Sequence, residues 1–197
     1  LMELVLLCVA QRRLDDAHAH LARGLAREPA SPVLLNLQAL VLGAGFRYAE
    51  AEVVLRALVD EAPGFVEARH NLAMAINDQQ RLAESEALLH AILAERPDHV
   101  DVRFHLAMIE LQSGRLAPGW AGYELRRGGR LAAPFPEWRG EDLAGKQIVL
   151  VGEQGFGDHL QFIRFVPRLA ALGATVDLVC QPELAAILGT VPGLNQI

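Results

Sequence analysis

The apolar positions of the first 130 residues recur with a period of 34. In each unit a small residue follows one large apolar residue by three positions and precedes another by four, so all three share one helix face. Small residues let two helices approach closely, and a proline closes the unit because it cannot continue the second helix. The positions in register are Leu14, Tyr48, Leu82 and Leu116; Ala17, Ala51, Ser85 and Gly119; Leu21, Leu55, Leu89 and Tyr123; and Pro29, Pro63 and Pro97.

This pattern predicts four antiparallel helix pairs in an α-solenoid. The predicted ranges are 1–11 with 14–27, 31–43 with 48–61, 66–79 with 82–95, and 100–113 with 116–127. The two Asn-Leu dipeptides at 36–37 and 71–72 are 35 residues apart instead of 34. We therefore expect one extra residue in the glycine-rich turn at 43–47.

The pattern changes to that of an α/β unit after residue 146. The β-branched run 147–151 predicts a strand, and the glycine loop 153–158 follows it. Two glycines in this loop, Gly155 and Gly157, would let the backbone turn sharply and leave N–H groups exposed at a helix N-terminus. The rest of the unit is predicted as a helix at 159–172, a strand at 175–180, a helix at 182–189 and the start of a strand near Asn195.

The fold class is therefore mainly α, with repeats at 1–130, a Pro- and Gly-rich junction at 131–146, and a partial Rossmann-like unit of parallel βαβα type at 147–197. A sheet of two or three parallel strands is a small core. We expect it to lean on the solenoid, to pair with another chain through its open edge, or to belong to a longer protein. Both ends look cut, because Leu1 lies inside a helical pattern and Ile197 follows the start of a strand.

Composition excludes several classes of function. Hydrophobic residues make up 52% of the 197 residues and charged residues 21%, which is typical of a well-cored folded protein. The net charge of −6 leaves no large basic face, so we expect no nucleic-acid binding. The apolar run from Leu4 to Ala10 is too short to span a bilayer, and we expect no membrane association. Cys8 and Cys180 lie far apart in apolar segments, which favours buried thiols in a reducing cytoplasm.

The histidines show no metal-ligand spacing. His18 and His20 lie two positions apart on a helix and so face different directions. His70, His90 and His99 have no partner at ligand spacing, and we interpret them as surface residues. The sequence predicts no metal site.

The repeats resemble the tetratricopeptide repeat (TPR) in period and in the positions of small and large residues, over roughly residues 1–130. The resemblance implies that a protein or peptide binds along a concave face lined by the first helices. On that face we place Asn36, Asn71 and His105, with Glu3 in the first repeat. Asparagine amides can both donate to and accept from an extended backbone, in a way similar to the asparagine ladder of O-GlcNAc transferase. The alternative is that both asparagines are solvated helix positions.

Three ordered motifs extend the resemblance beyond the repeats. Together they resemble bacterial TPR proteins fused to a glycosyltransferase-type domain, which are related to O-GlcNAc transferases and, through the Gly-Asp loop, to heptosyltransferases. This implies a parent protein that transfers a sugar from a nucleotide-sugar donor to a protein or peptide held by the repeats. The motifs are Gly-Trp-x-x-Tyr-Glu-x-Arg at 119–126, Pro-x-Trp-x-Gly-x-x-Leu-x-Gly-Lys at 136–146, and Glu-Gln-Gly-x-Gly-Asp-x-x-Gln-Phe-x-Arg-Phe-x-Pro at 153–167.

Such enzymes hold the donor mainly on a second Rossmann-like domain, which lies outside this chain. We therefore expect this chain to bind no cofactor and to be inactive alone. The resemblance places the glycine loop at the acceptor side of the cleft, where Asp158 would act as a general base and His159 would share that role or be solvated. Asp158 is also expected to cap the helix N-terminus. The expected substrate-binding residues are Glu153, Gln154, Gly155, Gly157, Gln161 and Arg164.

Two other interpretations remain open at this point. The chain would be a non-catalytic TPR adaptor if its α/β tail is only a structural cap. A dinucleotide-binding loop is disfavoured, because Leu160 replaces the third glycine and Asp158 would repel a phosphate. Aromatic residues concentrate near the junction, either as glue between the two parts or as the wall of a sugar pocket; they are Trp120, Tyr123, Phe135 and Trp138.

Overall fold

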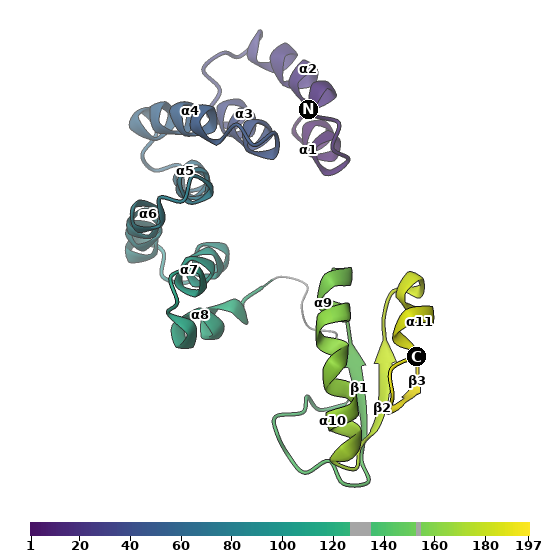
Figure 1. Cartoon of the computed structure of the whole chain (residues 1–197). Helices are drawn as coiled ribbons and strands as arrows, with labels where there is room; N and C mark the ends of the chain where they lie inside the picture. Colours follow the sequence, from purple (N-terminus) through teal and green to yellow (C-terminus); the bar gives the residue numbers. More distant parts are fainter. Residues whose placement is uncertain (127–134, 153–154) are drawn as a thin grey trace. The chain divides into compact units, whose positions relative to one another are not determined.

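The computed structural model describes residues 1–126, 135–152 and 155–197. The chain folds into two compact units, Leu1–Arg126 and Arg127–Ile197 (Figure 1). The first unit is helical and the second is an α/β unit.

The first unit contains the four predicted helix pairs. The second helix of the last pair ends four residues before the predicted limit of 127. Figure 1 shows the pairs following one another along a curve, with the first helix of each pair on the inner side. The pairs are α1 (Met2–Ala10) with α2 (Leu14–Leu25), α3 (Pro32–Ala44) with α4 (Tyr48–Glu61), α5 (Val66–Asp78) with α6 (Leu82–Glu95), and α7 (Val100–Gln112) with α8 (Leu116–Tyr123).

The turn inside each pair is the same in all four repeats, and the expected extra residue at 43–47 is not there. Each turn has three residues, of which the middle one has a left-handed backbone. The helices α3, α5 and α7 therefore start and end 34 residues apart. As a result, Asn36 shares its register with His70, while Asn71 shares its register with His105. The left-handed residues are Arg12, Phe46, Gln80 and Gly114, with φ of 60°, 61°, 63° and 78°.

The small residues at the fixed positions lie where the two helices of each pair cross. Ala17, Ala51 and Ser85 are at most 1% exposed. Ser85 also donates a hydrogen bond from Oγ to the carbonyl of Ala73 at 2.6 Å. A Cβ placed on Gly119 would lie 2.8 Å from the side chain of Leu111, closer than real contacts allow. The close approach of the helices predicted from these positions is therefore present.

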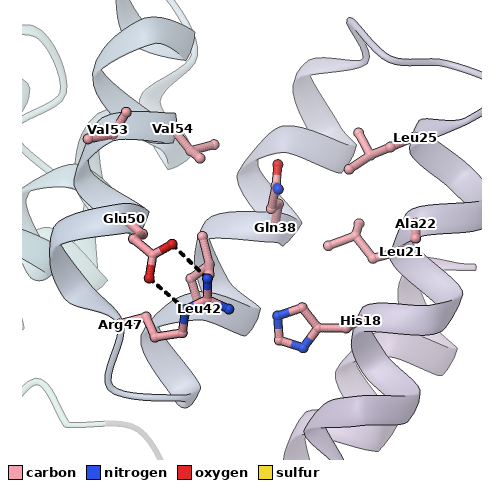
Figure 2. Close-up of a pocket in the computed structure, with 10 residues that line it drawn as sticks. All are labelled: His18, Leu21, Ala22, Leu25, Gln38, Leu42, Arg47, Glu50, Val53 and Val54. Carbon is pink, nitrogen blue, oxygen red and sulfur yellow. Dashed lines mark hydrogen bonds and ion pairs between the residues drawn. The ribbon is translucent and has the colours of Figure 1, made fainter.

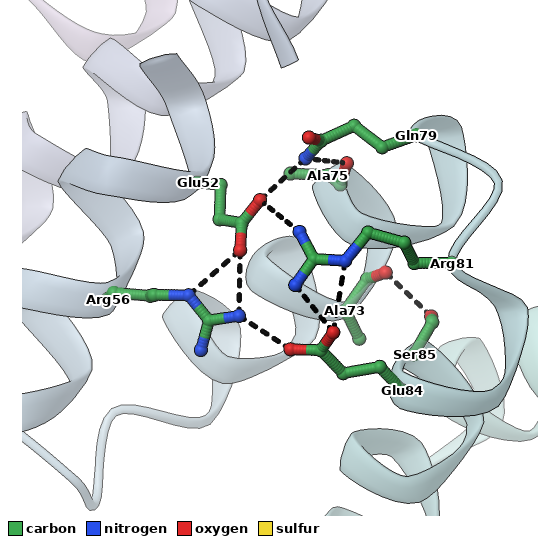
Figure 3. Close-up of polar contacts among 8 residues, drawn as sticks. All are labelled: Glu52, Arg56, Ala73, Ala75, Gln79, Arg81, Glu84 and Ser85. Atoms are coloured by element: carbon green, nitrogen blue, oxygen red, sulfur yellow. Dashed lines mark hydrogen bonds and ion pairs between the residues drawn. The ribbon is translucent and has the colours of Figure 1, made fainter. Parts of the chain in front are cut away.

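An ion-pair network joins the second helices α4 and α6 (Figure 3). Glu52 of α4 is only 9% exposed and accepts hydrogen bonds from Arg56, Gln79 and Arg81. Burial alone would raise the pKa of the Glu52 carboxyl, but these three donors outweigh it and lower the pKa to about 2. Glu84 binds the same two arginines, at 2.5 Å each. The network therefore holds α4 and α6 together through groups that stay charged at neutral pH.

The second unit contains a parallel sheet in the order β1-β2-β3. Its strands are β1 (Gln147–Val151), β2 (Thr175–Val179) and β3 (Leu194–Gln196), as the sequence predicts. Gln147 pairs with Thr175 and Val151 with Val179 along one register.

The helix predicted at 159–172 differs from the structure. It begins three residues earlier as α9 (Phe156–Phe162), passes through the 3₁₀ turn η1 (Ile163–Phe165) and continues as α10 (Val166–Ala171). Pro167 in the first turn of α10 cannot donate a backbone hydrogen bond, which accounts for the break. The last helix, α11 (Pro182–Leu188), follows β2.

The apolar core of this unit lies on one face of the sheet. Leu150, Val176 and Leu178 pack there, against α10 and α11. The residues that alternate with them include Val151 and Val179, which are 38% and 53% exposed. Strand side chains point to opposite faces in turn, so these valines belong to the opposite face.

Candidate functional site

The candidate catalytic loop lies where β1 ends and α9 begins. Gly152 continues the sheet, because its N–H donates to the carbonyl of Val179 at 2.9 Å. Gly155 is the N-cap residue of α9. Two predicted site residues, Glu153 and Gln154, lie outside the described residues.

The glycine that the fold requires here is Gly152. Neither Gly155 nor Gly157 has a positive φ, so the expected sharp turn does not depend on them. A Cβ on Gly157 would meet nothing within 4 Å, and one on Gly155 would only touch Asp158 at 4.0 Å. A Cβ on Gly152, in contrast, would lie 1.5 Å from Nε2 of His159. The two loop glycines therefore leave open space, while Gly152 makes room for a side chain of the protein itself.

His159 is buried, so its interpretation as a solvated residue is wrong. It is 7% exposed, and Nδ1 lies 3.0 Å from the carbonyl of Gly155. A carbonyl only accepts, so Nδ1 carries the proton and Nε2 of the neutral ring is an acceptor. That Nε2 is buried without a partner among the described residues. His159 thus bonds to the N-cap residue of its own helix and packs close to Gly152, which follows β1.

Asp158 lies in the first turn of α9 and does not cap it. The helix has no side-chain cap, and the Asp158 N–H donates to the carbonyl of Gly155 at 3.1 Å. The expected N-cap role is wrong because α9 starts at Phe156, two residues before Asp158. The carboxylate is half-buried and close to the positive end of the helix dipole.

Gln161 near the end of α9 and Arg164 in η1 are both exposed. The Nε–H of Arg164 donates to the carbonyl of Gln161, at the end of the helix. The guanidinium therefore folds back onto its own backbone. Gly155, Gly157, Asp158 and His159 lie at the N-cap and in the first turn of α9, and Gln161 and Arg164 follow them on the exposed surface.

The three polar residues predicted on the first helices take part in two side-chain contacts between neighbouring repeats, one of which also includes His70. Asn71 of α5 donates from Nδ2 to Oδ1 of Asn36 in α3, at 2.8 Å. His70 of α5 and His105 of α7 are joined by Nε2 and Nδ1 at 2.6 Å. Since 36 and 70, and 71 and 105, are related by the repeat, both contacts link the same two positions of neighbouring repeats. The helices α1, α3, α5 and α7 also contact one another in succession.

Three histidines gather at this side of the solenoid, which corrects the interpretation of His70 and His99 as surface residues. The ring of His70 lies 4.7 Å from that of His105 and 5.9 Å from that of His99. Burial, then His105 and His99, lower the pKa of His70 to about 4. Burial also lowers the pKa of His105. Sequence reasoning missed this cluster, although a spacing of one repeat plus one residue, as in 70 and 105, is the signal for it.

The remaining histidines make local contacts. His18 bonds from Nδ1 to the carbonyl of Leu14 at 2.8 Å, whereas His20 contacts Arg23. His90 is exposed and lies 3.6 Å from Glu86. In the described part of the chain, no group of three or more histidine, cysteine or acidic side chains is placed to hold a metal ion. No described helix is long and apolar enough to cross a membrane.

The aromatic residues near residues 119–138 keep much of their surface exposed. Trp120, Phe135 and Trp138 are 56%, 49% and 43% exposed. Trp120 meets Tyr123 edge-on with ring centroids 5.5 Å apart, and Trp138 donates from Nε1 to the carbonyl of Glu141 at 2.8 Å. Their predicted roles, as glue between the units or as a sugar-pocket wall, stay predictions.

The fold that these features define is a TPR-type solenoid followed by a small parallel α/β unit. An O-GlcNAc transferase of Thermobaculum terrenum, solved as a mutant, aligns with 99% of this chain at a TM-score of 0.58 and 19% identity. This chain spans 40% of that protein. At this identity the likeness shows a shared fold alone.

Two further solved structures share the fold. PilF of Pseudomonas aeruginosa aligns with 96% of this chain, and with 76% of its own, at a TM-score of 0.53 and 16% identity. MamA of Desulfovibrio magneticus, from residue 41 to its end, aligns with 62% of this chain and 70% of its own, at 0.52 and 16%. Identities this low show a shared fold alone.

Sequence comparison gives a shorter match. FlbA of Caulobacter vibrioides is 37% identical over 70 residues, which are 32% of this chain and 12% of FlbA. The chain thus spans about an eighth of that relative. No family model matches.

Proposed function

We propose that the solenoid binds an extended segment of a partner protein along α3, α5 and α7. The observation that carries this proposal is the pair of equivalent polar contacts, Asn36 with Asn71 and His70 with His105. Each contact leaves part of the donor and acceptor capacity of its side chains unused, and a peptide backbone offers the complementary N–H and C=O groups. The three asparagine and histidine positions proposed to meet the peptide are Asn36, Asn71 and His105.

The proposal is tested by selecting peptides for the intact chain from a random library displayed on phage and measuring their affinity by calorimetry. Asn71→Ala should weaken the selected peptides about tenfold, because each lost side-chain hydrogen bond is worth about 1 kcal/mol and Asn36 also loses its partner. Asn195→Ala in β3 is the matched control, since Asn195 likewise bonds a neighbouring side chain, Asp177 at 2.8 Å. Equal affinity of Asn71→Ala and the wild type would refute the peptide site.

For the α/β unit we propose that it is the first part of a glycosyltransferase-like domain in a longer parent protein. Support comes from the motif order at 119–167 and from the likeness of the whole chain to an O-GlcNAc transferase. The parent would bind a nucleotide sugar and transfer the sugar to the segment held by the repeats. Asp158 would accept the proton of the acceptor nucleophile, in the open space left by Gly155 and Gly157.

The decisive measurement is a calorimetric titration of nucleoside-diphosphate sugars into protein extended past Ile197, followed by a transfer assay. Asp158→Asn should abolish transfer and leave donor affinity unchanged, whereas Asp142→Asn, in an exposed turn with a bond to the N–H of Ala144, should change neither. Transfer that survives in Asp158→Asn would rule out the base. Failure of every donor to bind would favour the alternative, a TPR adaptor with a structural α/β cap.

A further inference from the structure

At three equivalent places the side chains of one second helix come near the start of the next second helix. These places are called here repeat interfaces: α2 with α4, α4 with α6, and α6 with α8. The same ion pair joins the second and the third. In the second, Oε2 of Glu52 lies 2.7 Å from Nη1 of Arg81. In the third, Oε1 of Glu86 lies 2.8 Å from Nη2 of Arg115. An acid on the earlier helix thus meets the arginine just before the later helix.

The first repeat interface has the arginine but lacks the acid. Position 18, which corresponds to Glu52 and Glu86, holds His18, and position 22, which corresponds to Arg56, holds Ala22. Arg47 occupies the place of Arg81 and binds only its own Glu50, from Nε at 2.7 Å and from Nη2 at 2.6 Å. Among the described residues its Nη1 has no hydrogen-bond partner. This is the nitrogen that Arg81 uses for Glu52, while its own Nε and Nη2 hold Glu84.

A pocket opens at the first repeat interface, where His18 and Ala22 stand in the places of Glu52 and Arg56 (Figure 2). Its volume is about 430 Å³, within the range of small-ligand pockets. Leu21, Leu25 and Val54 line its apolar part. Its polar part is lined by His18, Gln38, Arg47 and the Glu50 that Arg47 binds. Gln38 has the register of Leu72, an apolar side chain that is only 3% exposed at the second interface. A polar amide therefore faces the pocket where the next repeat has an aliphatic filler.

We propose that this pocket binds a carboxylate attached to an apolar group, with Arg47 as its cation. The ligand carboxylate takes the place that the carboxylates of Glu52 and Glu86 hold at the other two interfaces, and Nη1 of Arg47 donates to it. The apolar group lies against Leu21, Leu25 and Val54.

His18 supplies a second polar contact. Its Nδ1 carries a proton, because it donates to the carbonyl of Leu14, so Nε2 of the neutral ring is an acceptor. This Nε2 is buried and has no partner among the described residues. If Nε2 takes up one proton from solvent as the carboxylate binds, this unsatisfied buried acceptor becomes the donor of a charge-assisted hydrogen bond to the ligand.

A fatty acid and an acidic side chain flanked by apolar residues present the same chemistry, and the experiment separates them. Sodium octanoate, octanamide, N-acetyl-Leu-Glu-Leu-amide and its Gln analogue are titrated into the isotope-labelled chain and followed by NMR. Each carboxylate should bind about tenfold more tightly than its amide, a difference expected of one partly exposed charge-assisted hydrogen bond. The shifted signals should lie in α2, α3 and α4. Octanoate binding more tightly than the peptide assigns the site to free acids, and the reverse assigns it to a partner segment.

Three variants make the result specific to the pocket. Arg47→Met should reduce octanoate binding to the level of octanamide, while Arg115→Met, which removes the equivalent arginine at the third repeat interface, should leave it unchanged. His18→Glu supplies the missing carboxylate within the chain and should block octanoate without lowering the melting temperature. The proposal is overturned if neither carboxylate binds, if neither binds better than its amide, or if the carboxylate that binds does so as tightly to Arg47→Met as to the wild type.

Discussion

Replacing Glu52 by Gln tests how the solenoid holds its repeats together. The carboxylate is 9% exposed and receives hydrogen bonds from Arg56, Gln79 and Arg81 (Figure 3). Gln keeps the size of the side chain but removes its charge. Both arginines then lose a buried anion, while the four helices α3 to α6 keep their apolar contacts.

The size of the effect follows from the pKa of Glu52, which is about 2 in the folded chain and 4.5 for an unperturbed glutamate carboxyl. Full conversion of that difference gives roughly 3 kcal/mol. Since Arg56 and Arg81 are 45% and 41% exposed, solvent screening lowers the value, and we expect about 2 kcal/mol. Because the folded pKa is the lower one, this contribution is fully present above pH 4.5 and is lost as the pH falls toward 2.

The assay is urea unfolding of the full chain, followed by far-UV circular dichroism, together with hydrogen exchange of the α4–α6 amides, since a repeat array need not unfold in one step. Glu50→Gln on the same helix is the control: its side chain is 59% exposed, so solvent screens its pairing with Arg47 and we expect a much smaller loss. The difference between Glu52→Gln and the wild type should shrink to less than about half at pH 3. Equal losses for the two variants, or a Glu52→Gln loss that does not change with pH, would refute the reasoning.

Two further predictions concern His70 and Gly152. The His70 ring should stay neutral until the pH approaches 4, because burial, His105 and His99 lower its pKa. The contribution of His70 to stability is therefore lost as the pH falls from 6.5 toward 4. His70→Asn should remove this pH dependence from the free energy of unfolding. An NMR titration of the ring that gives an ordinary histidine pKa would contradict this. Gly152→Ala should cost about 2 kcal/mol or more, because the new Cβ meets Nε2 of His159, whereas Gly157→Ala should be nearly neutral. Thermal unfolding measures both, and a Gly152→Ala chain as stable as Gly157→Ala would show that the ring has room to move.

The helix pairs could be predicted from sequence because their signal is repeated. A small residue at positions 17, 51, 85 and 119 marks the same helix crossing four times, and a single misleading residue cannot shift it. The register of the first helices was harder. The two Asn-Leu dipeptides suggested a shift of one residue, but the three-residue turns with left-handed Phe46 and Gln80 keep the period at 34. The backbone geometry of the turn, and not the repeated Asn-Leu dipeptide, sets the register of the first helices.

The candidate loop shows a different limit. Its position after the first strand followed from the hydrophobic pattern, and the strand is there. The state of His159 did not follow, because it depends on the missing side chain of Gly152, seven residues away, and on a helix that starts earlier than its amphipathic pattern. The His70 cluster was missed for a related reason: side chains that meet across two repeats are one position out of register, and a search for equal positions passes over them.

The inner and outer sides of the solenoid use polar groups in opposite ways. On the outer side, the second and third repeat interfaces are closed by full charges, such as Glu52 with Arg81, that saturate one another. On the inner side the contacts join neutral groups, Asn36 with Asn71 and His70 with His105, whose remaining donors and acceptors are not all used. Ion pairs formed within the chain favour stability, whereas side chains with unused hydrogen-bond donors and acceptors favour binding of a partner that can exchange. The first repeat interface breaks this division, because Arg47 keeps a donor that no acid in the described part of the chain meets, and departures from a local rule are where function is expected.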